Sequence, residues 1–316
     1  MKGPRVILAG GSGFLGRPLA RYLVAREYEV VVLSRDCRQV GLPGRQVHWD
    51  GRTTGAWVEQ IEGARAMVNL AGRSVNCRYT AANRRSILDS RVVPTRVLGE
   101  AIGQCAQPPR VWLNSSTATI YKRSFDRAMD EATGEIGATP EAKDAFSVEV
   151  ARAWEGALER AHTPGTRKVA LRTAMVLGSG EGGVFRVLRR LTRMGLGGAM
   201  GGGRQFVSWV HEEDFCRAVQ WLIDRDDLAG PVNVAAPGPV TNREMMRTFR
   251  RLCGMPIGLA ATRSMLELGA LFLRTETELI LKSRRVIPGR LTESGFEFRF
   301  ARLEEALEEI LRTNDP

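Results

Sequence analysis

The sequence lacks the features that mark membrane, secreted and zinc-binding proteins. No apolar run approaches the roughly 18 residues that a membrane span needs. Glycines interrupt the apolar residues Val6–Ala9, so the N-terminus has no signal-peptide core. The five cysteines are scattered and form no Cys-x-x-Cys pair, which indicates neither a disulfide framework nor a metal site. We therefore expect a cytoplasmic protein with no membrane association and no metal.

Lysine is also scarce, although the formal net charge is +11, from 46 Lys+Arg against 35 Asp+Glu. Only five of the basic residues are lysines, and the arginines are spread along the chain, many of them in pairs. No long basic tract and no basic motif interleaved with aromatic residues is present, so we do not expect nucleic-acid binding. An attraction for phosphorylated small molecules is a better use of the positive charge than nucleic-acid binding.

The apolar pattern predicts an α/β fold, with a doubly wound parallel sheet of the Rossmann type and a smaller, mainly helical C-terminal lobe. Short apolar runs alternate with helical patterns in the first half, which is typical of βαβ units. We expect residues 1–177 and 206–236 to form the nucleotide-binding domain, and residues 178–205 and 237–316 to form the substrate-side lobe. The predicted strands are Arg5–Ala9, Glu29–Leu33, Met67–Leu70, Val111–Asn114 and Val169–Val176; the predicted helices are Gly13–Arg26, Arg84–Gln104 and Phe146–Ala161.

The second half begins with a different composition. Six glycines between Gly195 and Gly203 predict a loop. Thr241 and Glu244 have the spacing of a capping box and predict the start of a helix. Toward the C-terminus, Leu291–Phe300 is interpreted as a short strand and Ala301–Leu311 as a final amphipathic helix.

The strongest functional signal is a glycine loop that directly follows the first strand. Gly10, Gly13 and Gly16 have the Gly-x-x-Gly-x-x-Gly spacing. We expect the first glycine to make the tight turn, the second to let a pyrophosphate approach, and the third to allow close helix packing. The helix N-terminus would present amides to the phosphates. The predicted dinucleotide-binding residues here are Gly10, Gly11, Ser12, Gly13, Phe14, Leu15 and Gly16.

The residues after the second strand indicate which dinucleotide is bound. An NAD site places a carboxylate there for the ribose 2′-hydroxyl, whereas an NADP site has a cation. Ser34 stands at the expected acid position, and the guanidinium of Arg35 can pair with a 2′-phosphate. Asp36 would serve NAD if the strand ended two residues later. We therefore predict NADP(H), with NAD(H) as the alternative.

Several motifs resemble the extended short-chain dehydrogenase/reductase family of NAD-dependent epimerases and dehydratases, in its "epimerase family", cell-division-inhibitor-like branch. The glycine loop matches, and Asn69-Leu70-Ala71-Gly72 resembles the fourth-strand motif. The resemblance implies that the backbone of Leu70, Ala71 and Gly72 lines the adenine and ribose side of the cofactor. Further matches are Ser115–Tyr121, Trp209–Asp214 and, less specifically, Ser74–Tyr79.

The residues that carry catalysis in this family are present only in part. The family uses a Ser/Thr, a Tyr and a Lys, of which the Tyr transfers a proton and the Lys lowers its pKa. Thr117 matches the Ser/Thr position. Phe146 and Val150 stand where the resemblance implies the Tyr and the Lys, and no Tyr-x-x-x-Lys exists anywhere in the chain. The usual mechanism is therefore not available.

Other side chains are candidates for the missing role. Tyr121, at the end of the fifth strand and followed by Lys122, is a candidate acid, and a wall of the pocket is its alternative role. His211 is a candidate base, because the unperturbed imidazole pKa suits neutral pH. Its alternative role is structural. Arg204 and Gln205 are candidates for binding an anionic or polar substrate group, whereas Arg172, within a buried strand, is expected to be structural.

Two functions remain open at this stage. One is an NADP-dependent oxidoreductase or epimerase with a non-standard proton donor, acting on an unidentified small molecule. The other is a non-catalytic NADP(H)-binding sensor or interaction partner. The resemblance also makes a homodimer through helices Arg84–Gln104 and Phe146–Ala161 plausible.

Overall fold

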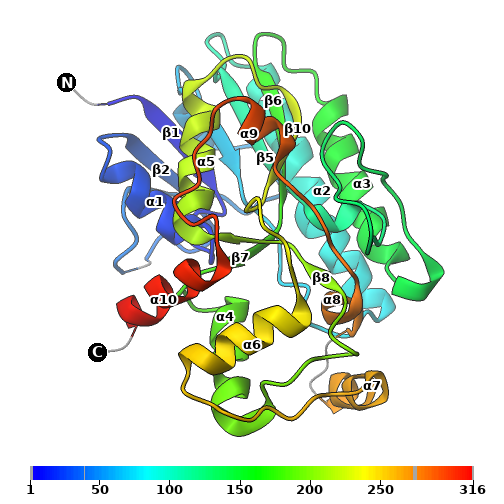
Figure 1. The fold of residues 1–316 in the computed structure, drawn as a ribbon. Helices are drawn as coiled ribbons and strands as arrows, with labels where there is room; N and C mark the ends of the chain where they lie inside the picture. Colours follow the sequence, from blue (N-terminus) through cyan, green and yellow to red (C-terminus); the bar gives the residue numbers. More distant parts are fainter. Residues whose placement is uncertain (1–2, 39, 273–275, 315–316) are drawn as a thin grey trace.

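A computed structural model describes residues 3–38, 40–272 and 276–314. Its centre is a seven-stranded parallel sheet in the order β10-β6-β5-β4-β1-β2-β3 (Figure 1). The strands are β1 (Arg5–Ala9), β2 (Glu29–Ser34), β3 (Arg45–His48), β4 (Ala66–Asn69), β5 (Val111–Thr117), β6 (Arg167–Thr173) and β10 (Gly230–Val234). The predicted Rossmann α/β fold is confirmed.

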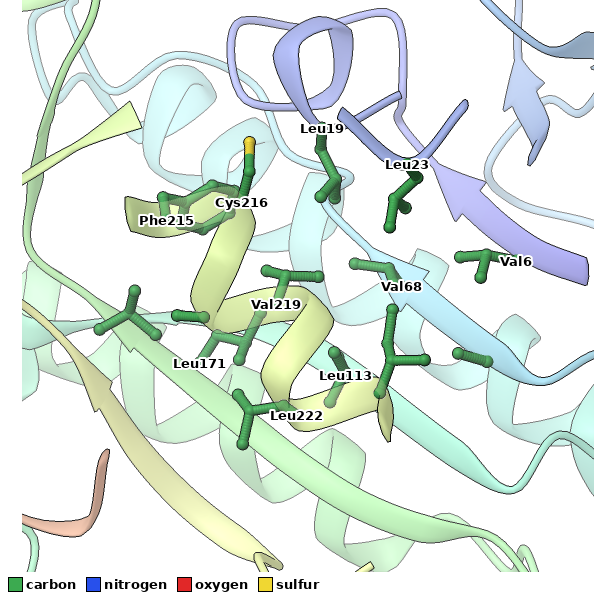
Figure 2. Close-up of a cluster of buried hydrophobic side chains, with 14 of the residues drawn as sticks. Val6, Leu19, Leu23, Val68, Leu113, Leu171, Phe215, Cys216, Val219 and Leu222 are labelled. Carbon is green, nitrogen blue, oxygen red and sulfur yellow. The ribbon is translucent and has the colours of Figure 1, made fainter. Parts of the chain in front are cut away.

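Helices cover both faces of this sheet, which explains why its central strands are almost continuously apolar. On one face lie α1 (Gly16–Val24) and α5 (Glu212–Asp224). Figure 2 shows Leu19 and Leu23 of α1 and Val219 and Leu222 of α5 packed with side chains of the strands, including Val6. All five side chains are 0% exposed.

The opposite face is covered by α2 (Ala81–Gly103) and α3 (Ala145–Arg160), which pack on each other (Figure 1). Thr80 caps α2 by accepting a hydrogen bond from the Asn83 amide at 3.3 Å. A buried polar cluster joins these helices to the sheet. Asn69 of β4 donates to Asn114 of β5 at 2.7 Å, and Trp154 of α3 donates to Thr95 of α2 at 3.1 Å.

A second lobe lies below the sheet in Figure 1. Its core includes Phe185, Trp209, Met245, Phe249 and Leu307. The predicted capping box is confirmed, because the Thr241 hydroxyl accepts from the Glu244 amide and the Glu244 carboxylate accepts from the Thr241 amide. The helices of this part are α4 (Val184–Leu191), η4 (Thr192–Leu196), α6 (Asn242–Leu252), α7 (Arg263–Phe272), α8 (Glu278–Leu281) and α10 (Leu303–Asn314), and its short strands are β7 (Met175–Leu177), β8 (Phe206–Val207), β9 (Trp209–His211) and β11 (Val240–Thr241).

Two predicted strands differ from the structure. The strand expected over Leu291–Phe300 is wrong: the chain forms α9 (Gly289–Glu293) and then a turn at Gly295, whose φ is +84°. Leu291 and Phe296 are both buried against the sheet core, Leu291 from the short helix and Phe296 from the chain just after the turn. The strand expected over Val169–Val176 is divided. The Ala174 amide donates to Val234 and the next amide donates to Ser208, so the chain leaves the main sheet there.

The edge strand β3 has no counterpart among the predictions. Its residues are exposed or partly exposed, and so the period-2 apolar pattern is weak. The short 3₁₀ turns η1 (Ala56–Gln60), η2 (Ala118–Ile120) and η3 (Pro140–Ala142) complete the described elements.

Candidate dinucleotide and substrate site

The glycine loop joins β1 to α1 at the carboxyl edge of the sheet. Gly10 has a φ of +75°, and a Cβ on it would lie 2.9 Å from the Ala71 amide nitrogen. A Cβ on Gly16 would lie 2.4 Å from the backbone of Gly11, so this glycine lets the first turn of the helix pack on the loop. At Gly13 the nearest atom would be 3.5 Å away, the Gly10 carbonyl oxygen, which is an ordinary van der Waals contact, so the protein itself has room for a Cβ here.

The helix begins later than predicted. The α-helix starts at Gly16, with Leu15 as the N-cap residue, whereas the sequence pattern placed its start at Gly13. Residues 10–15 form turns instead, in which the Gly13 amide donates to the Gly10 carbonyl at 3.2 Å. The N-terminus of α1, where amides favour negative charge, therefore still faces the loop.

The motif after β4 lies directly beside this loop. The Leu70 amide donates to the Ala9 carbonyl at 2.8 Å, and the Ala71 amide donates to Asn69 Oδ1 at 3.0 Å. A side chain on Gly10 would collide with Ala71. Leu70, Ala71 and Gly72 thus form a second wall next to the turn at Gly10.

The end of β2 also reaches the loop. Ser34 is 6% exposed, and its hydroxyl donates to Ser12 Oγ at 3.3 Å and accepts from the Asp36 amide at 3.3 Å. Arg35 is exposed, and within the part of the chain that the structure describes it has no ion pair or hydrogen bond through its guanidinium. Asp36 Oδ1 accepts from the Arg38 amide at 2.9 Å, so this carboxylate is turned toward its own loop.

Thr117 is the last residue of β5, opposite Thr173 of β6, and it is partly exposed. Its hydroxyl accepts from the Thr119 amide at 3.2 Å, which orients the oxygen and leaves its proton for a donor role. This strand end belongs to the same carboxyl edge as the glycine loop, where ligands of open α/β sheets bind.

Tyr121 is 1% exposed and belongs to a buried polar network. Its hydroxyl donates to Asn233 Oδ1 and accepts from Arg172 Nη1, both at 2.9 Å. Arg172 also donates two hydrogen bonds of 2.8 Å to the carboxylate of Glu155. Burial raises the pKa of the tyrosine, although the neighbouring Arg172 opposes this. The geometry favours a structural role, and catalysis by Tyr121 stays a prediction.

Phe146 and Val150 lie one helical turn apart on α3 and are 8% and 5% exposed. They form a small apolar cluster with Ile87 of α2. The ring of Tyr79 meets that of Phe146 edge-on, with the centroids 4.9 Å apart. The face of α3 that carries these two residues is therefore part of the core, and neither position holds a charged group or one that can transfer a proton.

A buried ionic cluster near the start of α3 had no counterpart among the predictions. Lys282, 1% exposed, forms an ion pair with Asp144, which is 0% exposed, and donates to the Thr119 carbonyl at 2.7 Å. Close by, Glu278 accepts from Ser147 and, at 3.3 Å, from the hydroxyl of Tyr79.

Burial controls the titration of this cluster. It raises the pKa of Glu278 and lowers that of Lys282. Burial, assisted by the Glu278 charge, also raises the pKa of Tyr79 to about 12. Because the partners are far apart in sequence, no spacing rule could have found them.

His211 has a structural environment. The imidazole is 3% exposed; Nδ1 accepts from the Glu213 amide at 3.1 Å, and Nε2 lies 2.9 Å from Glu309 Oε2. Burial lowers its pKa, although the carboxylates around it oppose the shift. Nδ1 is already used as the cap of α5, and Nε2 faces the Glu309 carboxylate, so neither nitrogen is left for a substrate.

Comparison with known proteins agrees with this geometry. The model of the NAD dependent epimerase/dehydratase family matches residues 6–235. The chain belongs to this family. A second model, a domain of unknown function (DUF1731), matches residues 263–310 of this epimerase family member. The resemblance to the extended short-chain dehydrogenases is confirmed.

Relatives match over nearly the whole chain. An epimerase family protein of Mycobacterium bovis is 33% identical over 303 residues, 96% of each chain. The human epimerase family protein SDR39U1 is 31% identical over 312 residues, which cover 97% of this chain and 99% of the relative. The crystal structure of human SDR39U1, isoform 2, with NADPH has a TM-score of 0.83 at 30% identity and covers 98% of this chain and 99% of its own.

More distant structures share the fold alone. The structure of MoeE5 with UDP-glucuronic acid and NAD has a TM-score of 0.75 at 20% identity. Among the described residues of this epimerase family member, no helix is both long and apolar enough to cross a membrane.

Proposed function

We propose that this epimerase family member binds NADP(H) on the glycine loop and acts as an oxidoreductase or epimerase on a small molecule. The observation that carries the proposal is the loop itself. The backbone is crowded at Gly10 and Gly16, whereas a Cβ at Gly13 would make only an ordinary van der Waals contact with the protein, so a glycine there suits close approach of a pyrophosphate. The solved human relative is described with NADPH, which supports the same class of cofactor.

The preference for the 2′-phosphate rests on the end of β2. Ser34 is small and lies against Ser12, Arg35 is exposed without a partner among the described residues, and the Asp36 carboxylate is held by the Arg38 amide. A guanidinium free to pair with a phosphate dianion favours NADP(H) over NAD(H).

Binding titrations with NADPH and NADH test this assignment. Arg35→Gln should weaken NADPH binding about tenfold, because one charge-assisted hydrogen bond is lost, and should leave NADH binding unchanged. Arg110→Gln is the control. It removes the same charge from an exposed position just before β5, at the end of the strands opposite to the glycine loop. If Arg35→Gln kept the full preference for NADPH, Arg35 would have no part in selecting the cofactor.

The residues that would act on a substrate are few. The bound dinucleotide would supply or accept the hydride. Thr117 can donate a hydrogen bond to a substrate oxygen, because its own oxygen already accepts from Thr119. Loss of such a donor in Thr117→Val should lower turnover by about a hundredfold or more.

The second candidate is a non-catalytic NADP(H)-binding sensor. A specific observation favours it: Phe146 and Val150 are apolar core, and the hydroxyl of Tyr121 is occupied in a buried network. NADPH deuterated at the transferable position, incubated with a cytosolic small-molecule extract, separates the two functions. Label that leaves the cofactor in the wild type, but not in Thr117→Val, supports the enzyme; label retained in the wild type supports the sensor.

A further inference from the structure

Tyr79 lies against the start of α3, although it comes from a distant part of the chain, directly before α2. Its ring meets the Phe146 ring edge-on at 4.9 Å. Its hydroxyl donates to Glu278 of α8 at 3.3 Å, and its amide donates to Glu276 at 2.8 Å. Tyr79 is partly exposed, and α8 lies in the lower part of Figure 1. A tyrosine therefore stands beside position 146, where the family resemblance implies one.

The carboxyl group of Glu278, which is 5% exposed, is oriented through one of its oxygens. Oε1 accepts from Tyr79 and from the Ser147 hydroxyl of α3. Among the residues that the structure describes, none forms a hydrogen bond with the buried Oε2. Burial penalises the ionised form of such a carboxyl group, and so the pKa of Glu278 is raised, although Ser147 and the charge of Arg284 oppose this.

Two guanidinium groups connect Tyr79 with the dinucleotide and substrate site. Arg91 of α2 lies beside the dinucleotide wall, because a Cβ on Gly72 would be 3.5 Å from its guanidinium carbon. Arg284 donates to the Thr119 hydroxyl at 3.1 Å, and the Thr119 amide in turn orients the hydroxyl at the end of β5. Burial lowers the pKa of both arginines, and an ionised Tyr79 is close enough to oppose each shift. A tyrosinate formed here would therefore be stabilised by two cations.

The protonation state of Glu278 decides where the proton of Tyr79 points. Burial and an ionised Glu278 hold this proton and raise the pKa of Tyr79 to about 12. A neutral Glu278 donates to the tyrosine oxygen instead, which leaves the tyrosine proton for a substrate and stabilises the oxygen when that proton leaves. The other charged groups that surround the pair in the described chain are Arg78, Arg84, Arg91, Asp144, Glu276, Lys282 and Arg284.

On the basis of the proposed oxidoreductase function, we propose that Tyr79 donates a proton to the oxygen of a carbonyl substrate, an aldehyde or a ketone, and that Glu278 positions it. The carbonyl carbon takes a hydride from the reduced dinucleotide, which is oxidised. The carbonyl oxygen takes the Tyr79 proton as the tyrosine O–H bond breaks, so that an alcohol forms. The tyrosinate then recovers a proton from water.

Transfer of deuterium from labelled NADPH to molecules of a cytosolic extract, followed by mass spectrometry, measures the reaction. Tyr79→Phe keeps the ring against Phe146 and removes only the hydroxyl, so transfer should fall by about a hundredfold or more. Tyr28→Phe is the matched control, because Tyr28 also donates to a carboxylate, that of Asp224, at 2.7 Å, and burial likewise raises its pKa to about 12. This control should transfer label like the wild type.

A pH profile separates positioning by Glu278 from a merely structural role. Transfer by the wild type should fall as the pH rises through the pKa of Glu278, because the ionised carboxylate no longer donates to the tyrosine oxygen. Glu278→Gln, whose amide can donate at every pH, should lose this fall. Glu278→Ala should be slower than Glu278→Gln throughout.

The coupling of the two groups has a readout that needs no substrate. The tyrosinate absorbance of the wild type minus that of Tyr79→Phe should titrate with a pKa of about 12. In Glu278→Gln the pKa of Tyr79 should be lower, because a neighbouring negative charge has been removed. NADPH affinity and the circular dichroism spectrum should be unchanged in both variants.

The possible results distinguish this assignment from the function on which it rests. Equal label transfer by Tyr79→Phe and the wild type would overturn the role of Tyr79 and leave the proposed oxidoreductase in place. Label retained on bound NADPH by the wild type would overturn the oxidoreductase, and the role of Tyr79 with it. If Tyr79→Phe failed to fold, a wild-type pH profile in Glu278→Gln would overturn the proposal.

Discussion

Removal of one partner from the buried Asp144–Lys282 ion pair should destabilise the fold strongly. The two side chains are 0% and 1% exposed, so water cannot replace a missing partner. Each also has a second bond: Asp144 accepts from the Thr139 amide at 2.9 Å, and Lys282 donates to the Thr119 carbonyl at 2.7 Å. The pair joins the start of α3 to the end of α8, two segments more than a hundred residues apart.

The magnitude follows from the cost of a buried, uncompensated charge. Either Lys282→Met or Asp144→Asn should lower the free energy of unfolding by about 3–5 kcal/mol. The double variant removes both charges and should cost less than the sum of the two single variants, because residues in contact do not behave additively. A neighbouring surface pair is the control. Lys143 and Glu267 are 66% and 46% exposed and 3.6 Å apart, so Lys143→Met should change stability by at most about 1 kcal/mol.

Equilibrium unfolding in urea, followed by the fluorescence of the six tryptophans, measures all four variants. If Lys282→Met were as stable as the wild type, or if the costs of the single variants added in the double variant, then the ion pair would not be coupled in the folded protein. The reasoning from burial would then be refuted.

Three further predictions concern the loop, the histidine and the tyrosine. Gly16→Ala should destabilise the protein and abolish dinucleotide binding, because its Cβ would lie 2.4 Å from the backbone of Gly11. Gly13→Ala, whose Cβ would lie 3.5 Å from the nearest atom, should fold normally and lose NADPH affinity alone. Circular dichroism, which reports folding, and a binding titration separate the two results. Burial lowers the pKa of His211 in the folded protein, so the unfolded chain binds more protons at this residue. The stability that the residue contributes is therefore present above its unfolded pKa and is lost as the pH falls below that value. Urea midpoints measured between about pH 8 and about pH 5 should fall less steeply in His211→Gln, and equal slopes would show that another group controls the acid limb. Tyr121→Phe should lower the free energy of unfolding by about 1–3 kcal/mol, because it leaves Asn233 and Arg172 without their hydroxyl partner, and it should leave NADPH binding intact. A loss of turnover at unchanged stability would instead assign the hydroxyl to catalysis.

Local patterns were sufficient for most of the Rossmann domain. A strand such as β1 is a run of apolar residues buried on both faces, and the glycines that follow it have backbone reasons to be glycine, so both are visible in the sequence. The capping box at Thr241 needs only residues three apart, and it was found for the same reason. The segment Leu291–Phe300 shows where local signals mislead: its apolar residues suggest a strand, but Leu291 and Phe296 reach the sheet core from a short helix and from the chain after the turn at Gly295.

By itself the sequence determined the fold class, the family, the dinucleotide loop and the apolar residues at positions 146 and 150, because each depends on residues that are close together along the chain. Only the tertiary structure decided that Tyr121 is bound to Asn233 and Arg172, and that Lys282 pairs with Asp144. Burial and charge compensation depend on distances in space, which spacing along a chain does not record.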